Sequence, residues 1–264
     1  MLPFNNYRRN SHRPSQNACL KHGHYPARWK HFSTIVLRKP GKPDYTIPKA
    51  YRPIALEETL GKVCEAVITR RLSNLAEMHA LLPANQFGAR PGRTTTVTNM
   101  VKDTQRSHEV TSVLFLDISQ AFPNVNATRL THNFRCRRVP ENIVRLVTSF
   151  LENRFTTLSF DDHTTPSFAA SNGIPQGSPL SPILHIFYSA DLLEITEPHR
   201  SHVRPRELTA GFVDNSTFVV SSPSFDENME KMEGLLRKAL EWAKLHAYQF
   251  DVNKFILVHF LSQY

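Results

Sequence analysis

The sequence predicts an α+β fold, and three features support this prediction. Apolar residues recur at helical spacing from Leu60 to about Met78, and again from Met229 to Ala243. Short apolar runs bounded by Gly, Pro or polar residues are typical of β-strands at several other places. With 264 residues, 40% of them hydrophobic, and no internal repeat, the chain can bury a core as one continuous domain.

The first half of the chain contains two predicted strands on either side of a long helix. The run Thr34–Leu37 is typical of a strand, and it ends in a basic loop over residues 38–43, where Gly and Pro interrupt regular structure. The apolar stripe of the helix over residues 60–78 is expected in the core. A compact apolar strand, Val113–Leu116, ends on Asp117.

The middle of the chain contains two predicted helices with a strand and a loop between them. Periodicity predicts a helix over residues 141–153 and a strand over residues 155–160. Residues 173–179 hold too many Gly and Pro for a regular element. A helix is predicted from Ser181 to about Ile195, with Pro182 in its first turn. A Gly-rich loop that leads into a helix presents backbone N–H groups, which suits a phosphate or base.

The last part of the chain contains a predicted β-hairpin. Two apolar runs, Leu208–Val213 and Ser216–Val220, are separated by Asp214-Asn215, which is compatible with a tight turn. A capping-box pattern that begins at Ser224 starts the second long helix. Residues 255–260 read as a final strand. The hairpin would place Asp214 at its tip.

The net charge of +9 is concentrated at the start of the sequence. Residues 1–43 contain no Asp or Glu, and they contain nine basic residues: Arg8, Arg9, Arg13, Lys21, Arg28, Lys30, Arg38, Lys39 and Lys42. Removing these nine from the 32 basic residues leaves 23, which equals the 23 acidic residues. This segment suits the neutralisation of nucleic-acid phosphates, and the alternatives are a solvated tail or an Arg-rich transit segment.

Several function classes are not supported by the composition. No stretch approaches the ~20 apolar residues of a membrane-spanning helix, so we expect an intracellular protein without a membrane partner. Three scattered cysteines without C-x-x-C spacing argue against a disulfide framework and for a reducing compartment. The group Cys19, His22 and His24 lacks a second ligand pair, so it is more simply a coincidence than a zinc site.

Asp117 and Asp214 each follow or interrupt a strand, so their carboxylates converge if the two strands are neighbours. Carboxylate oxygens hold Mg²⁺, and two metals roughly 3.5 to 4 Å apart can activate a 3′ hydroxyl and stabilise a leaving pyrophosphate. Each residue also has a simpler explanation, because Asp117 could cap a turn and Asp214-Asn215 could be a turn only.

Six short motifs occur in a fixed order along the chain. They are Lys39-Pro40-Gly41-Lys42, Tyr51-Arg52-Pro53-Ile54-Ala55-Leu56, Gln86-Phe87-Gly88, Leu116-Asp117-Ile118-Ser119-Gln120-Ala121-Phe122, Gly173-Ile174-Pro175-Gln176-Gly177-Ser178-Pro179-Leu180-Ser181-Pro182 and Phe212-Val213-Asp214-Asn215. In this order they resemble the reverse transcriptases of non-LTR (LINE-type) retrotransposons, closest to those of fungal genomes. The resemblance runs from about Ala18 to Phe260, and each motif alone would be a weak signal.

The resemblance implies roles for residues at the centre of these motifs. Asp117 and Asp214 would be ligands of two Mg²⁺ ions. Phe122 would be a steric gate that excludes a ribose 2′-OH, although core packing is the alternative role of such a ring. Gln176 and Gly177 would contact the incoming nucleotide and the template.

The resemblance also implies a group of cations around the substrate. Lys39, Lys42 and Arg52 would grip the triphosphate, for which a guanidinium fork and ammonium groups are suited. Lys254 lies where the family has a lysine able to protonate pyrophosphate, and a solvated surface lysine is the alternative.

The sequence departs from the family pattern at three places. Asn215 replaces the second Asp of the hairpin, which removes one negative charge and should lower metal affinity and rate. Pro123 replaces the Asp that usually follows the gate, with an effect that the sequence does not reveal. The sequence stops at Tyr264, where the family continues into a thumb, so we expect weaker grip on a duplex.

The resemblance therefore implies the fingers and palm of a right-hand polymerase over residues 18–264, with an antiparallel palm sheet backed by helices, no thumb, and a basic, flexible start over 1–17. The implied function is RNA-directed DNA synthesis, impaired in this copy, with an RNA template, a DNA primer and deoxynucleoside triphosphates as partners. The alternative is a decayed retroelement fragment that only binds nucleic acid. A nucleotidyl cyclase also uses paired carboxylates but needs no Pro-Gln-Gly loop. Oligomeric state stays open, and a nuclear location is compatible with a retroelement.

Overall fold

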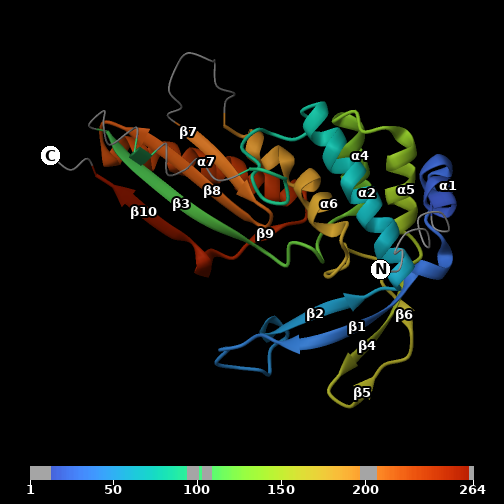
Figure 1. The fold of residues 1–264 in the computed structure, drawn as a ribbon. Helices are drawn as coiled ribbons and strands as arrows, with labels where there is room; N and C mark the ends of the chain where they lie inside the picture. The colour runs from blue at the N-terminus through green and yellow to red at the C-terminus, as the bar shows by residue number, and fades with distance from the viewer. Residues whose placement is uncertain (1–12, 94–100, 103–108, 197–206, 262–264) are drawn as a thin grey trace, which may run out of the picture.

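The computed structural model describes residues 13–93, 101–102, 109–196 and 207–261, and of residues 13–17 it describes only the backbone. Two β-sheets lie at either end of a layer of helices (Figure 1). We call them the palm sheet and the fingers sheet. The chain alternates between them, so residues far apart in the sequence meet where the sheets face the helices. Among the described helices, none is long and apolar enough to cross a membrane.

The palm sheet is antiparallel, in the order β10-β3-β8-β7, with β9 pairing to the end of β3. Its strands are β3 (Val110–Ser119), β7 (Glu207–Phe212), β8 (Asn215–Ser222), β9 (Gln249–Phe250) and β10 (Ile256–Phe260). Helix α7 (Phe225–Leu245) covers one face, as Figure 1 shows. Leu114, Leu116 and Phe218 belong to the core on that face, because alternate strand residues point to the same side.

The fingers sheet has the order β2-β1-β4-β5, and β6 pairs with β4. Its strands are β1 (His31–Arg38), β2 (Tyr51–Leu56), β4 (Phe155–Phe160), β5 (His163–Thr164) and β6 (Phe168–Ala169). Strand β1 is antiparallel to β2 and parallel to β4. A parallel pair needs a long crossover, and here the palm strand β3 and several helices lie between β1 and β4 in the sequence.

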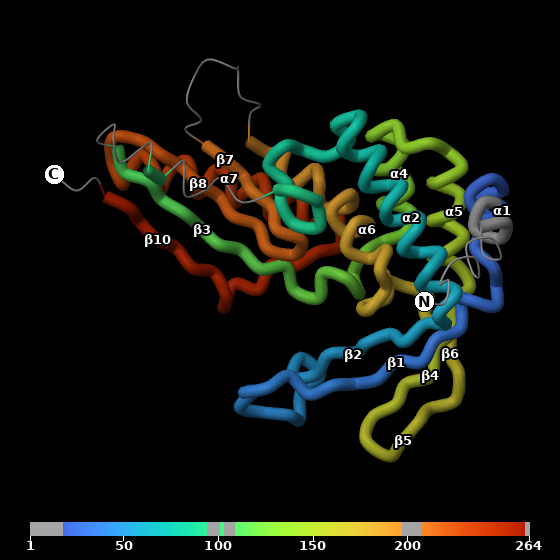
Figure 2. Tube along the Cα trace, viewed as in Figure 1, coloured from blue at the N-terminus to red at the C-terminus, as the bar shows by residue number. Residues whose placement is uncertain are grey.

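The helices between the two sheets contribute to one continuous hydrophobic core. The α-helices there are α1 (Arg13–His22), α2 (Thr59–Met78), α4 (Ala127–Cys136), α5 (Glu141–Leu151) and α6 (Ser181–Tyr188). Short 3-10 helices are η1 (Ala27–Lys30), η2 (Pro48–Ala50), η3 (Ala190–Glu194) and η4 (Val252–Lys254). Helices α4 and α5 run side by side in the Cα trace of Figure 2, and α1 packs against α5 and α2.

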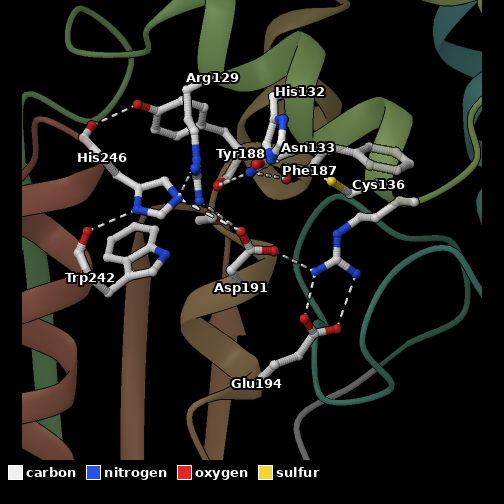
Figure 3. A network of polar contacts seen from close by, with 12 residues as sticks. Arg129, His132, Asn133, Cys136, Phe187, Tyr188, Asp191, Glu194, Trp242 and His246 are labelled. Carbon is white, nitrogen blue, oxygen red and sulfur yellow. Dashed lines mark hydrogen bonds and ion pairs between the residues drawn. The ribbon is translucent and has the colours of Figure 1, made fainter.

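A polar network joins this helix layer to α7 behind the palm (Figure 3). Asp191 of η3 accepts from Arg137, the residue that follows α4, at 2.7 Å, and it lies 3.7 Å from Arg129 of α4. Arg129 Nε donates to His246 Nε2 at 3.1 Å, and His246 Nδ1 lies 2.8 Å from the Trp242 carbonyl oxygen. Because these residues come from three elements, the network holds α4, η3 and the end of α7 in fixed relation.

Most predicted elements are confirmed, and four details are corrected. The strand over residues 155–160 and the long helices agree closely with the structure. Leu60 and Val63, expected in the core, are 43% and 41% exposed, because only one side of α2 meets the core. Asp117 lies inside β3 and does not end the strand.

The two other corrections concern chain turns. The helix predicted from Ser181 to Ile195 ends at Tyr188 and gives way to η3 after Ser189. The tight turn of the hairpin consists of Val213 and Asp214, and Asn215 is the first residue of β8. Residues 13–17 belong to α1 and residues 1–12 lie outside the described part of the chain, so the flexible start over 1–17 stays a prediction.

Candidate active site

Two neighbouring palm strands bring the predicted carboxylates to one place. Asp117 on β3 is directly opposite Asn215 on β8, and Asp214 immediately precedes Asn215 in the turn. Directly opposed residues of an antiparallel pair point to the same face of the sheet. The backbone adds a further link, because the Ile118 amide donates to the Asp214 carbonyl oxygen at 3.4 Å. Asp117 and Asn215 therefore share the palm face opposite α7, and Asp214 is close enough for the charge of Asp117 to raise its pKa.

The turn that carries Asp214 has a strained backbone. Val213 has φ +60°, a left-handed conformation that a β-branched residue rarely adopts. A two-residue hairpin loop with positive φ at its first position normally has Gly there. Tertiary contacts must therefore hold this turn in place.

The segment Asn85–Gly88 provides those contacts. Backbone bonds join it to Gly211, with Phe87 N donating to Gly211 O at 2.9 Å and Gly211 N donating to Asn85 O at 3.0 Å. A Cβ atom at Gly88 would lie 2.4 Å from Val213 N, so only glycine allows this approach. Figure 2 shows this stretch, which follows α2, beside the end of β7. Sequence reasoning gave the Gln86-Phe87-Gly88 motif no role, although its glycine was the available signal.

Lys254 contacts Asp117 directly. Its Nζ lies 2.6 Å from Asp117 Oδ2 and 3.7 Å from the Asp251 carboxylate. Strand β9 pairs with the end of β3, and the Asp251 amide donates to the Asp117 carbonyl oxygen at 2.9 Å. These contacts hold η4, which contains Lys254, next to Asp117. The hydrogen bond to Asp117 raises the pKa of Lys254. Lys254 is therefore a charged partner of the site.

Cations of the fingers face the same carboxylates. Burial lowers the pKa of Lys39, and the charges of Arg52, Lys42 and Lys254 lower it further. Lys39 Nζ donates to the Lys49 carbonyl oxygen at 2.9 Å, which holds it at the end of β1. Lys42 and Arg52 are therefore close enough to Lys39 for their charges to act on its pKa.

Asp214 is influenced by both sheets. Burial raises its pKa, the negative charge of Asp117 raises it too, and the charges of Lys254 and Arg52 act in the opposite direction. Arg52 is on the fingers strand β2, while Asp214 is on the palm. The fingers cations and palm carboxylates are therefore close enough to interact.

Phe122 lies in the turn that follows β3. Its ring is half-buried and stacks on His185, with ring centroids 5.3 Å apart, and His185 stacks in turn on Tyr248. His185 is fully buried, and burial lowers its pKa to about 4, so the ring is neutral. Phe122 thus packs on His185, and part of its side chain remains exposed. Sequence analysis missed His185, although a histidine within an apolar helix was a visible signal.

The turn containing Phe122 requires a glycine at position 173 and tolerates a proline at position 123. A Cβ atom at Gly173, which has φ +71°, would lie 2.5 Å from the Pro123 carbonyl oxygen. The bonds that close the turn come from Asn124 N and Val125 N, so the missing N–H of Pro123 is not needed.

The loop at Gln176 and Gly177 lies along the free edge of β2. Ala55 N donates to the Gln176 carbonyl oxygen at 2.7 Å. Gly177 has φ +116°, and a Cβ atom there would lie 2.7 Å from the Ala55 carbonyl oxygen. The loop thus joins the fingers sheet to α6, between the two groups of predicted site residues.

A family comparison identifies what this arrangement belongs to. Residues 37–261 match the model of the family described as reverse transcriptase (RNA-dependent DNA polymerase). The chain belongs to the reverse transcriptase family. The fold agrees, because a telomerase from Candida tropicalis, solved in complex with the TWJ fragment of telomeric RNA, has a TM-score of 0.61 at 13% identity. That alignment covers 94% of this chain and 44% of the telomerase.

Curated relatives are reverse transcriptases of non-LTR retroelements. The chain is 30% identical over 246 residues to a probable RNA-directed DNA polymerase from transposon BS of Drosophila melanogaster, covering 91% of this chain and 27% of that protein. It is 29% identical over 255 residues to the RNA-directed DNA polymerase from mobile element jockey of the same species, with coverage of 94% and 27%. The chain thus spans about 27% of the length of these relatives. The expectation that fungal elements are closest stays a prediction.

The donor set of the reverse transcriptase site fits a hard divalent cation. Asp117 and Asp214 supply carboxylate oxygens and Asn215 an amide oxygen, the ligand types that Mg²⁺ takes. Within the described ranges, no group of three or more His, Cys, Asp or Glu side chains could hold a metal. The raised pKa of Asp214 shows a carboxylate whose charge is incompletely offset, which a bound cation would correct. The site is thus suited to Mg²⁺ but holds one carboxylate fewer than the family pattern.

Proposed function

We propose that this chain is the fingers and palm of an RNA-directed DNA polymerase of a non-LTR retrotransposon, acting on deoxynucleoside triphosphates at the end of a DNA primer. The observation that carries the proposal is the closeness of Asp214 to Asp117 on neighbouring palm strands, with Arg52 of the fingers close enough to affect Asp214. Nucleotidyl transfer needs both parts, metal-binding carboxylates and cations for the triphosphate.

In this proposal the fingers and palm residues have separate tasks. Asp117 and Asp214 hold Mg²⁺, helped by the amide oxygen of Asn215, and a bound pair of ions would activate the 3′ hydroxyl and stabilise the leaving pyrophosphate. Lys39, Lys42 and Arg52 bind the triphosphate. Gln176 and Gly177 line the nucleotide, and the ring of Phe122 excludes a 2′-OH.

Lys254 has two successive partners in the proposal. Its Nζ lies 2.6 Å from Asp117 Oδ2. If Asp117 held Mg²⁺ through this oxygen, the Lys254 ammonium would be free to turn toward the pyrophosphate. A protonated lysine there can donate its proton to the leaving group. The raised pKa keeps the proton on Lys254 before it turns.

A second candidate function is nucleic-acid binding without polymerisation. It is favoured by Asn215, which stands opposite Asp117 and leaves the metal site one charge short. In that case the basic group, with the acid-free residues 1–43, binds phosphates, and affinity falls steeply with salt. Residues 1–12 of this segment lie outside the described part of the chain.

Primer extension separates the two functions. Purified protein is given an oligo(dT) primer on a poly(A) template with dTTP and Mg²⁺, beside an Asp117→Asn control. We expect extension that needs Mg²⁺ and is lost in the control. Salt-dependent duplex binding without extension would instead favour the binding fragment.

A further inference from the structure

A buried carboxylate lies behind the nucleotide loop, away from the palm site. Glu65 of α2 is 0% exposed, and it occupies a position on the helix face that also carries Ile68 and Leu72. Among the described residues no ion pair of Glu65 is found. A carboxylate in such surroundings is stable only when hydrogen-bond donors surround it.

Two hydroxyl groups supply those donors, one to each oxygen of Glu65. Tyr25 Oη donates to Oε1 at 2.8 Å, and Ser178 Oγ donates to Oε2. Tyr25 is 1% exposed and is fixed by ring contacts with Trp29 and Phe150, so it cannot turn away. The Glu65 carboxylate therefore accepts from one hydroxyl group in the helix layer and from one in the loop.

Ser178 directly follows Gln176 and Gly177, and its hydroxyl organises the rest of the loop. Its Oγ accepts from Leu180 N at 3.1 Å, so Glu65, Ser178 and the start of α6 form one chain of hydrogen bonds. On the other side of the loop, Ala55 N holds the Gln176 carbonyl oxygen at 2.7 Å. Gln176 and Gly177 are thus held by β2 on one side and, through Ser178, by α2 on the other.

We propose that Glu65 is a positioning residue, whose hydrogen bond to Ser178 sets the loop at Gln176 and Gly177 for the incoming nucleotide. The nucleotide as the ligand of the loop rests on the proposed function, whereas the positioning of the loop does not. Hydrogen bonds to a charged group are stronger than neutral ones, so a carboxylate constrains Ser178 more than an amide would.

The chain contains a matched control on the same helix. Glu77 of α2 also holds a charged hydrogen-bond network, accepting from Arg90 Nε at 2.6 Å and from Arg90 Nη2 at 2.8 Å. Its partners lie in the segment after α2 and not in the nucleotide loop. Glu77→Gln and Glu65→Gln therefore make the same chemical change in one helix, with different predicted effects on the loop.

The first measurement is amide hydrogen exchange over residues 173–180 in the protein without ligands. We expect about tenfold faster exchange in Glu65→Gln and in Ser178→Ala, no change in Glu77→Gln, and no further increase in the Glu65→Gln, Ser178→Ala double variant. Ser178→Ala keeps Glu65 and Tyr25, so it tests the loop even when Glu65→Gln fails to fold. Wild-type exchange in both single variants would overturn the positioning role.

The second measurement is dTTP affinity in a complex with a dideoxy-terminated oligo(dT) primer on poly(A). We expect Glu65→Gln to weaken dTTP binding about tenfold, with unchanged affinity for the primer and template, and Glu77→Gln to match the wild type. Equal dTTP affinity in wild type and Glu65→Gln would overturn the role toward the nucleotide. A wild type that binds no dTTP would contradict the proposed function, and hydrogen exchange would then decide the positioning role alone.

Discussion

The molecule contains two pairs of neighbouring carboxyl groups that are stabilised in opposite ways. Asp117 and Asp214 of the palm face the cations Lys254 and Arg52. Glu65 accepts from two hydroxyl groups, and its neighbour Glu57, between the fingers and the helix layer, is influenced mainly by burial and by Glu65. Burial raises the pKa of Asp214 and of Glu57, so desolvation acts on one member of each pair.

The difference lies in what offsets the charge. Burial, followed by contact with Glu65, raises the pKa of Glu57 to about 9, so this pair holds a proton at neutral pH. The palm pair has nearby positive charges instead, which favour ionised carboxylates. Protonation suits a pair that only supports the structure, whereas ionised oxygens are needed to bind a metal. The same kind of side chain thus supports the structure in one pair and, in the proposed function, binds a metal in the other, according to its neighbours.

Removing one charge from the palm pair should have the largest effect. Asp117→Asn loses a metal ligand and the ion pair with Lys254, so we expect primer extension to fall about a thousandfold or more, which corresponds to roughly 4 kcal/mol. Extension rates with Mg²⁺ measure this. Duplex affinity serves as the control and should stay near the wild-type value. Unchanged extension would remove Asp117 from the metal site.

Adding a charge to the palm pair should act in the other direction. Asn215→Asp places a carboxylate opposite Asp117, so we expect tighter Mg²⁺ binding and extension about ten- to a hundredfold faster, equivalent to roughly 1.4 to 2.7 kcal/mol. Mg²⁺ titrations of the extension rate measure it, with Asp117→Asn in both backgrounds as the inactive control. A folded Asn215→Asp variant that binds duplex but extends nothing would favour the binding fragment.

Displacing the turn at Val213 and Asp214 tests whether the function of the palm carboxylates depends on the position of this turn. Gly88→Ala puts a Cβ atom 2.4 Å from Val213 N, so we expect a shifted Asp214, about tenfold slower extension and a loss of roughly 1 to 3 kcal/mol in unfolding free energy. Gly234→Ala on α7 is the matched control, because nothing lies within 4 Å of its added Cβ. It should stabilise the helix by roughly 0.5 to 1 kcal/mol. Similar results for both variants would exclude a role for the Gly88 contact.

Much of the fold follows from sequence periodicity, and much of the site follows from motif order. The helix over 60–78 and the strand over 155–160 were predicted because their patterns are local. The turn was placed one residue late, because Val213 adopts positive φ against its own preference under the contact with Gly88. Local rules favour Asn in such a turn, so they pointed to Asn215.

The roles of buried polar residues were the least predictable. Glu65 occupies the apolar stripe of α2, but its donors come from Tyr25 and Ser178, 40 and 113 residues away in the sequence. Such a network exists only once the chain is folded, so spacing in the sequence could not reveal it. The position of a charged residue in an apolar stripe was the one visible signal.

Phe122 borders the palm pair, and its truncation should change selectivity more than stability. Phe122→Val should raise the ratio of ribonucleotide to deoxynucleotide incorporation several-fold, because the shorter side chain leaves room for a 2′-OH. The ring is only half-buried, so we expect less than the roughly 3 to 5 kcal/mol lost on truncating a fully buried Phe to Ala. His185→Phe keeps the stacked ring and is the control. A large loss of stability with unchanged sugar preference would indicate core packing.

The protonated pair should make stability depend on pH, and Glu57→Gln imitates the protonated side chain. Glu57 has a pKa of about 9 in the folded chain against an ordinary value of 4.5, so the folded state binds one proton more between these pH values. The free energy of unfolding should therefore fall as pH rises from about 4.5 to about 9, and this contribution is fully present only below the lower value. The groups that also act on Glu57 are Glu65, Lys62 and Arg154, and both cations favour its ionised form.

Glu57→Gln carries a neutral amide of similar shape, so its unfolding free energy should match the wild type near pH 5 and exceed it near pH 9. Urea unfolding at pH 5, 7 and 9 measures the difference, with Glu77→Gln as the control, because the pKa of Glu77 is about 2 and its charge does not change in this range. Parallel pH profiles for wild type and Glu57→Gln would show that Glu57 is ionised, and the contrast between the two carboxyl pairs would then be wrong.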